Sequence, residues 1–174
     1  MPIKKSSDMS PLSINPPQAG SLVALADDLY WMRFNLPFRL NHINLYAFDT
    51  KDGWLLLDCG IKGDLTAAQW QMLLDRPLAG RPVSGIIVSH YHADHVGYAG
   101  ALATRTSAPV YMGAVEYEQT RWGLAQTDIE YGAMMATAYQ RFGLANSHIT
   151  KALDTGNYYR FLVGDLPNIL TVDS

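Results

Sequence analysis

The sequence has very little cysteine and no long apolar run. Cys59 is its only cysteine, so no disulfide can form within the chain, and its apolar surroundings favour a small buried residue over a reactive thiol. No apolar stretch approaches the ~18 residues of a membrane span. Ser, Pro and Asn follow Lys4 and Lys5, where a secretion signal needs an apolar segment. We therefore expect a cytoplasmic protein that does not enter a membrane.

Charge is also scarce. Charged residues make up 17% of the 174 residues, the net charge is -3, and no Lys/Arg cluster is present. These features do not favour a nucleic-acid partner and indicate a small-molecule substrate instead. Hydrophobic residues make up 48%, which is ordinary for a globular domain of this length with its own core.

The first two thirds of the chain alternate between strand-like and helix-like segments. We expect a mixed sheet with covering helices, an α/β (α+β) fold, because β-branched runs and helical spacing follow one another. The Asp-Gly pair at 52–53 indicates a hairpin turn, and Asp64 is the expected cap of the first helix. Strands are predicted at 22–25, 29–34, 44–48, 54–57, 85–89 and 109–112, and helices at 65–74 and 96–104.

The remaining segments have a different character. Residues 1–20 contain four prolines and several serines and are expected to form a mobile lead-in. Residues 114–150 show helical spacing, whereas 151–174 look irregular. An apolar stripe of Met134, Met135, Ala138 and Phe142 has two interpretations. It faces the core of a helix pair, or it belongs to a cap whose Met and Tyr side chains line a substrate entrance.

One short segment concentrates the chemistry. Residues 90–95 read His-Tyr-His-Ala-Asp-His and hold three of the five histidines in the chain. In an extended segment, alternate side chains share a face, which predicts that His90, His92 and Asp94 project together and that His95 points elsewhere. Imidazole and carboxylate groups are zinc ligands, so we predict a metal site. Gly97 and Gly100 would let the backbone pass close to this loop.

These residues resemble the metallo-β-lactamase superfamily. The segment 89–97 is similar to its His-x-His-x-Asp-His signature, Asp58 to the Asp that supports the metal loop, and residues 41–46 to an early Asn-containing strand. The resemblance covers roughly residues 22–112. It implies an αββα sandwich, of which 21–113 would be the N-terminal half and 114–150 a helical insertion. Residues 151–174 would be an irregular C-terminal segment at which the fold is truncated.

The resemblance also implies a ligand set. His90 and His92 would bind one metal, and Asp94 and His95 a second, with Asp94 also orienting a hydroxide for catalysis. Two Zn2+ ions are expected, with iron or manganese as alternatives. The family needs a further His, a bridging Asp and a last His. His148 and Asp165 are weak candidates for two of them, and otherwise the ligands lie outside this sequence.

A half-sandwich would leave one apolar sheet face in water, which predicts a homo-oligomer or association with a missing C-terminal half. The expected function is a metal-dependent hydrolase of a small ester, thioester or lactone. The alternatives are an iron-dependent redox enzyme similar to a sulfur dioxygenase, a nuclease, and an inactive fragment. His42 could lie near the site, Tyr91 and Ala93 could line the pocket, and Tyr98 is a weaker candidate for its wall.

Overall fold

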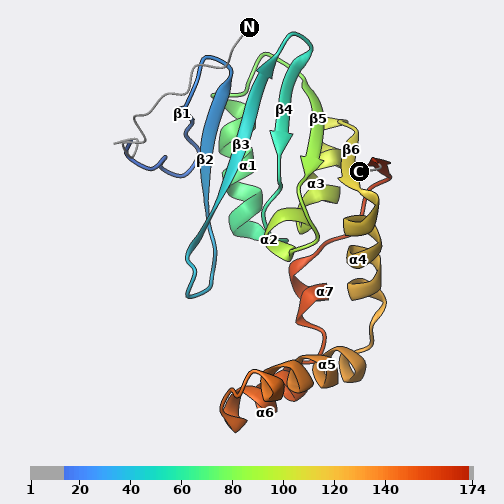
Figure 1. The fold of residues 1–174 in the computed structure, drawn as a ribbon. Coiled ribbons are helices and arrows are strands. Elements are labelled where there is room, and N and C mark those ends of the chain that lie inside the picture. Colours follow the sequence, from blue (N-terminus) through green and yellow to red (C-terminus); the bar gives the residue numbers. More distant parts are fainter. Residues whose placement is uncertain (1–13, 173–174) are drawn as a thin grey trace, which may run out of the picture.

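A mixed β-sheet organises the chain in a computed structural model, which describes residues 14–172 (Figure 1). Within that range the strands lie side by side in sequence order, antiparallel from β1 to β4 and parallel from β4 to β7. The hairpin predicted at 52–53 is confirmed. The strands are β1 (Val23–Ala24), β2 (Leu29–Asn35), β3 (His42–Thr50), β4 (Gly53–Leu57), β5 (Val83–Val88), β6 (Val110–Gly113) and β7 (Ile169–Val172).

One face of the sheet carries the core. Leu45, Leu56 and Ile86 on neighbouring strands are fully buried there, together with Trp70 and Leu102 from the covering helices. Burial of such side chains is the main favourable contribution to folding. These helices, α1 (Asp64–Asp75) and α3 (Ala99–Thr106), lie behind the sheet in Figure 1.

The opposite face is also apolar but is only partly buried. A single row of paired residues crosses six strands on this face, because side chains in register point the same way. The row consists of Trp31, Tyr46, Leu57, Ile87, Tyr111 and Leu170. An incompletely covered apolar face was expected of a half-sandwich, and the structure shows one.

The rest of the chain is helical, and it leaves and rejoins the sheet beside β6. Helices α5 and α6 extend below the sheet in Figure 1, and α7 returns toward it. We call residues 114–162 the cap. Its helices are α4 (Ala114–Ala125), α5 (Asp128–Arg141), α6 (Asn146–Thr155) and α7 (Tyr158–Leu162), and the short α2 (Ala93–Val96) precedes them on the sheet side.

Three local predictions were wrong. The described part of the segment predicted to be irregular, residues 151–172, contains the end of α6, all of α7, and β7, which pairs with β6. The single helix expected at 96–104 is two helices, α2 and α3, separated at Gly97 and Tyr98. Asp64 is the first residue of α1 and not its cap, because Gly63 occupies the cap position.

The predicted lead-in lies mostly on residues 1–13, outside the described residues. Among the helices of residues 14–172, none has the length and apolar character needed to cross a membrane.

Candidate metal site and adjoining cavity

A tight turn after β4 places Asp58 under the loop that follows β5. Asp58 has a left-handed backbone (φ 67°), which Asp tolerates better than most residues. Gly60 has φ 83°, and a Cβ there would come within 2.9 Å of Thr66 Cγ2, so glycine is required. The backbone N–H of Asp58 donates to the Ile87 carbonyl at 2.8 Å. The turn is thereby attached to the neighbouring parallel strand.

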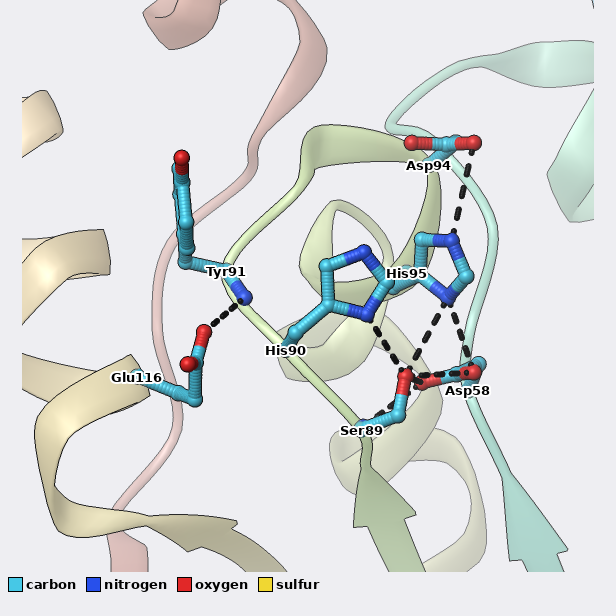
Figure 2. A network of polar contacts seen from close by, with 7 residues as sticks. All are labelled: Asp58, Ser89, His90, Tyr91, Asp94, His95 and Glu116. Atoms are coloured by element: carbon cyan, nitrogen blue, oxygen red, sulfur yellow. Dashed lines mark hydrogen bonds and ion pairs between the residues drawn. The ribbon is translucent and has the colours of Figure 1, made fainter.

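The Asp58 carboxylate organises the loop above it (Figure 2). It accepts hydrogen bonds from the Ser89 backbone N–H at 2.8 Å and from Ser89 Oγ at 2.9 Å. It also lies 2.8 Å from His95 Nδ1. A carboxylate can only accept, so in a neutral ring Nδ1 carries the proton and Nε2 keeps its lone pair. Supporting contacts of this kind orient histidine ligands in metal sites.

The four predicted ligands come together, although not as the alternation rule predicted. We call residues 90–95 the histidine loop. The His90 ring centroid is 4.6 Å from that of His92 and 3.9 Å from that of His95. His95 therefore does not point elsewhere. Helix α2 begins at Ala93, which rotates both Asp94 and His95 away from the positions of a fully extended chain.

One pair of donors has the separation that a shared metal ion needs. His95 Nε2 lies 3.7 Å from Asp94 Oδ2, too long for a hydrogen bond. Two ligands that each lie ~2.0–2.2 Å from one zinc ion can span such a distance. As the side chains stand, no group of three or more His, Cys, Asp or Glu residues within 14–172 is arranged to hold a metal. The donor chemistry fits a metal, while a complete ligand shell is not formed by the described residues.

Burial sets the protonation of two neighbouring groups. It lowers the pKa of His90, and the nearby His95 and His92 rings lower it further. Both effects favour the neutral imidazole, the form that can bind a metal. Burial likewise raises the pKa of Cys59, and the Asp58 carboxylate adds to that shift. Cys59 is thus a fully buried, protonated thiol, as predicted from its apolar surroundings.

The cap holds the histidine loop from the other side. The Tyr91 N–H donates to the Glu116 carboxylate of α4 at 3.0 Å (Figure 2), and the Tyr91 carbonyl accepts from the Tyr159 hydroxyl of α7. Burial raises the pKa of Tyr159 to about 12, so its hydroxyl stays protonated. Sequence reasoning missed both Glu116 and Tyr159, because they lie 25 and 68 positions from Tyr91 and no local pattern connects them.

The predicted close approach to the histidine loop is confirmed at Gly97, whereas Gly100 approaches the connection before β7 instead. A Cβ at Gly97 would overlap the backbone oxygens of Ala93 and Leu162, and one at Gly100 would overlap the carbonyl oxygen of Asp165. The Lys62 N–H also donates to the Leu162 carbonyl at 2.8 Å. The chain after α7 is therefore packed directly on α2 and α3.

A cavity of about 480 Å³ adjoins the histidine loop. Tyr91, His92, Ala93 and Asp94 form one wall, as predicted for Tyr91 and Ala93. Cap residues form the opposite wall. Met134 and Met135 belong to it and also pack against the buried core, so each of the two interpretations of these methionines describes part of their environment. The remaining lining includes Leu36, Phe38 and Leu40 before β3, and Trp122, Tyr131 and Tyr158 from the cap.

The remaining residues that the sequence suggested for the site do not line the cavity. Phe142 is 80% exposed, so it does not belong to an apolar stripe. His148 is exposed on α6, and Asp165 lies in the exposed connection to β7. His42 Nδ1 makes a local hydrogen bond to Asn41 at 2.8 Å. Tyr98 lies at the start of α3, in a separate surface depression from the cavity.

A family model and a crystal structure both match this chain over most of its length. The model of the metallo-beta-lactamase superfamily matches residues 39–168. The chain belongs to this superfamily. A crystal structure of a beta-lactamase domain protein from Burkholderia ambifaria superposes with a TM-score of 0.73 and 30% identity. The superposition covers 93% of this chain and 45% of the B. ambifaria chain.

Two curated relatives match over shorter segments. A metal-dependent hydrolase from Cupriavidus necator is 43% identical over 58 residues, which are 33% of this chain and 17% of that protein. The exodeoxyribonuclease YycJ of Bacillus anthracis is 37% identical over 68 residues, which are 39% of this chain and 25% of that protein. This chain thus spans less than half the length of the relatives that it matches.

Proposed function

We propose that this chain carries the histidine loop of a metal-dependent hydrolase that acts on a small ester, thioester or lactone. The ligands would be His90, His92, Asp94 and His95. The observation that carries the proposal is the contact of Asp58 with His95 Nδ1, which leaves Nε2 free and 3.7 Å from Asp94. The names of the superfamily and of the hydrolase from C. necator support the same chemistry.

When bound, a metal ion such as zinc activates water for attack on a carbonyl group and polarises that carbonyl. The chain's own residues have three tasks in this scheme. Asp58 holds the His95 ring in one tautomer, Glu116 and Tyr159 hold the backbone of the loop, and the cavity places a substrate beside His92 and Asp94. Preorganised positions of this kind reduce the cost of bringing reactants together.

The test is a zinc titration of metal-free protein of verified intact mass, followed by calorimetry, beside the double variant H90A/H92A. We expect zinc to bind the native chain and the variant to lose at least ten-fold in affinity. Equal affinity in both proteins would reject these ligands. Elemental analysis of the purified protein then separates zinc from iron, and bound iron would favour the redox alternative.

The match to an exodeoxyribonuclease supports a nuclease as the second candidate. Nucleic-acid binding relies on Lys and Arg contacts with phosphates, and neither residue type lines the cavity within residues 14–172. The hydrolase should therefore cleave p-nitrophenyl butyrate and leave single-stranded DNA intact. Metal-dependent cleavage of DNA, without cleavage of the ester, would favour the nuclease over the ester hydrolase.

A further inference from the structure

The cavity beside the histidine loop has a composition that restricts its ligand. About three quarters of its wall residues are aliphatic, aromatic or methionine, and they come from four separate parts of the chain. These are the connection before β3, Ile61 in the turn before α1, the histidine loop, and the cap. Leu36, Met135 and Leu162 represent the apolar lining, whereas His92, Asp94 and Gln119 supply polar atoms. Pockets of this kind hold apolar ligands and orient them through a few polar groups.

The charges of the lining residues restrict the ligand further. No Lys or Arg is among the residues that line the cavity within the described part of the chain, and Asp94 is its only carboxylate there. In the metal-free protein, a phosphate or carboxylate group inside would have no Lys or Arg partner and would face Asp94, which is unfavourable in a poorly hydrated site. A neutral group meets no such penalty.

The tyrosines add hydroxyl groups without adding charge. Burial raises the pKa of Tyr131 far above its usual range, and the Tyr131 and Tyr158 rings pack edge to face with centroids 5.4 Å apart. The Tyr131 side chain is thus a neutral part of the wall. Both tyrosines present ring surface to the cavity together with Met134 and Met135.

We propose that this cavity binds a neutral, medium-length alkyl or acyl chain, with the hydrolysable carbonyl at the end beside His92 and Asp94. This inference rests on the proposed function for the role of that carbonyl. The binding of the chain itself needs no metal, so the two proposals can fail separately. A volume of about 480 Å³ lies within the range of small-molecule pockets.

The test is calorimetric titration of the metal-free protein with acetamide, hexanamide, octanamide and octanoate. We expect affinity to rise roughly ten-fold from hexanamide to octanamide, because two more methylenes are buried. Octanoate should bind at least ten-fold more weakly than octanamide. Equal binding of all the amides, or tighter binding of octanoate, would overturn the inference.

Two tryptophan variants on the same helix locate the binding site. Met135→Trp fills the cavity and should weaken octanamide at least ten-fold, whereas Ile129→Trp, at a position 84% exposed, should change it less than two-fold. Circular dichroism confirms that each variant is folded, and the ligand series on the native chain does not depend on them. Unchanged binding in Met135→Trp would place the ligand elsewhere, for example on the open sheet face, and would reject the cavity.

The outcomes also separate this inference from the proposed function. Zinc binding without octanamide binding would reject the cavity as an alkyl site and leave the metal ligands standing. Octanamide binding without zinc binding would support the cavity and reject the hydrolase.

Discussion

The sheet and the cap are held together in different ways. The sheet buries a continuous row of apolar side chains between its strands and helices α1 and α3, and Leu45, Leu56 and Ile86 are completely inaccessible. In the cap, α6 buries no residue, and large apolar side chains such as Ile129 and Phe142 are exposed. The cap depends more on polar contacts, for example those of the buried Asn157 with the carbonyls of Gly123 and Gln126.

The histidine loop lies where these two regions meet. One side of the loop is attached to the sheet through Asp58, and the Cys59 N–H donates to the His95 carbonyl at 2.8 Å. The other side is attached to the cap through Glu116 and Tyr159. We infer that the sheet determines whether the ligands are in position, and that the cap determines what can bind beside them. The following predictions test that division.

The largest effect should come from the core of the sheet. Leu45→Ala removes a side chain with no exposed area and should lower the free energy of unfolding by about 2–5 kcal/mol. The same substitution at Leu153, which is 54% exposed on α6, should cost less than about 1 kcal/mol. Urea unfolding followed by circular dichroism measures both. Similar losses at the two positions would show that the cap is as tightly packed as the sheet.

The second-largest effect is expected at Asp58, which supports the histidine loop. Asp58→Asn replaces an acceptor of the His95 Nδ1–H with an amide, which disturbs the ring's tautomer. Zinc affinity should fall by about 10–100-fold, the usual cost of losing such a contact. Calorimetry measures the change, and Asp52→Asn in the exposed hairpin turn is the matched control. Unaltered affinity in Asp58→Asn would mean that His95 is not a ligand oriented by Asp58.

A smaller effect is expected at the start of α5. Thr127 Oγ1 accepts from the Glu130 N–H at 3.2 Å, and the Glu130 carboxylate accepts from the Thr127 N–H at 2.9 Å. Thr127→Ala should therefore destabilise the helix by about 1 kcal/mol. Hydrogen exchange should become faster in α5 while β4 and β5 keep their protection. Faster exchange in both regions together would contradict independent stability of the two.

The contact between α7 and the loop should have a similar or slightly smaller effect. Tyr159→Phe removes the hydroxyl that donates to the Tyr91 carbonyl and should cost about 0.5–1.5 kcal/mol. We expect octanamide binding to weaken more than zinc binding, because the cavity wall moves while Asp58 still holds the ligands. Tyr139→Phe, in α5 of the cap and outside the cavity lining, is the control. A larger loss of zinc affinity would show that the cap also positions the ligands.

The smallest effect concerns the pH response of the cap. Hydrogen bonds from the Arg160 guanidinium and the Asn157 N–H lower the pKa of Asp128 below its usual 3.8. The pKa of Asp128 is therefore lower in the folded protein than in the unfolded chain. Its carboxylate stabilises the fold fully above the unfolded-state pKa, and this stabilisation is lost as the pH falls through the folded-state pKa. The NMR shift of the Asp128 carboxyl carbon should titrate below pH 3.8, and Arg160→Gln should raise the midpoint. An unchanged midpoint would show that the ion pair does not persist in solution.

Sequence reasoning succeeded where the signal was local. The apolar and β-branched runs of β2–β5 and the Asp-Gly turn could each be recognised within a few residues, and the predicted sheet is present. Asp58 was identified through the resemblance to the superfamily. Sequence reasoning failed at α7 and β7. The five-residue α7 is too short for a clear helical period, and β7 is defined by its pairing with β6, some 59 positions earlier in the chain.

The sequence by itself determined the superfamily, the mixed sheet and the identity of the residues in the histidine loop, because neighbouring residues encode strands, turns and motifs. Only the tertiary structure decided the direction of His95, which depends on Asp58 37 positions away and on the start of α2 at Ala93. It also decided that Glu116, Tyr159 and the cap enclose a cavity beside the loop. Such contacts join segments that are distant in the chain, and they form only when the packing of the whole domain brings their backbones together.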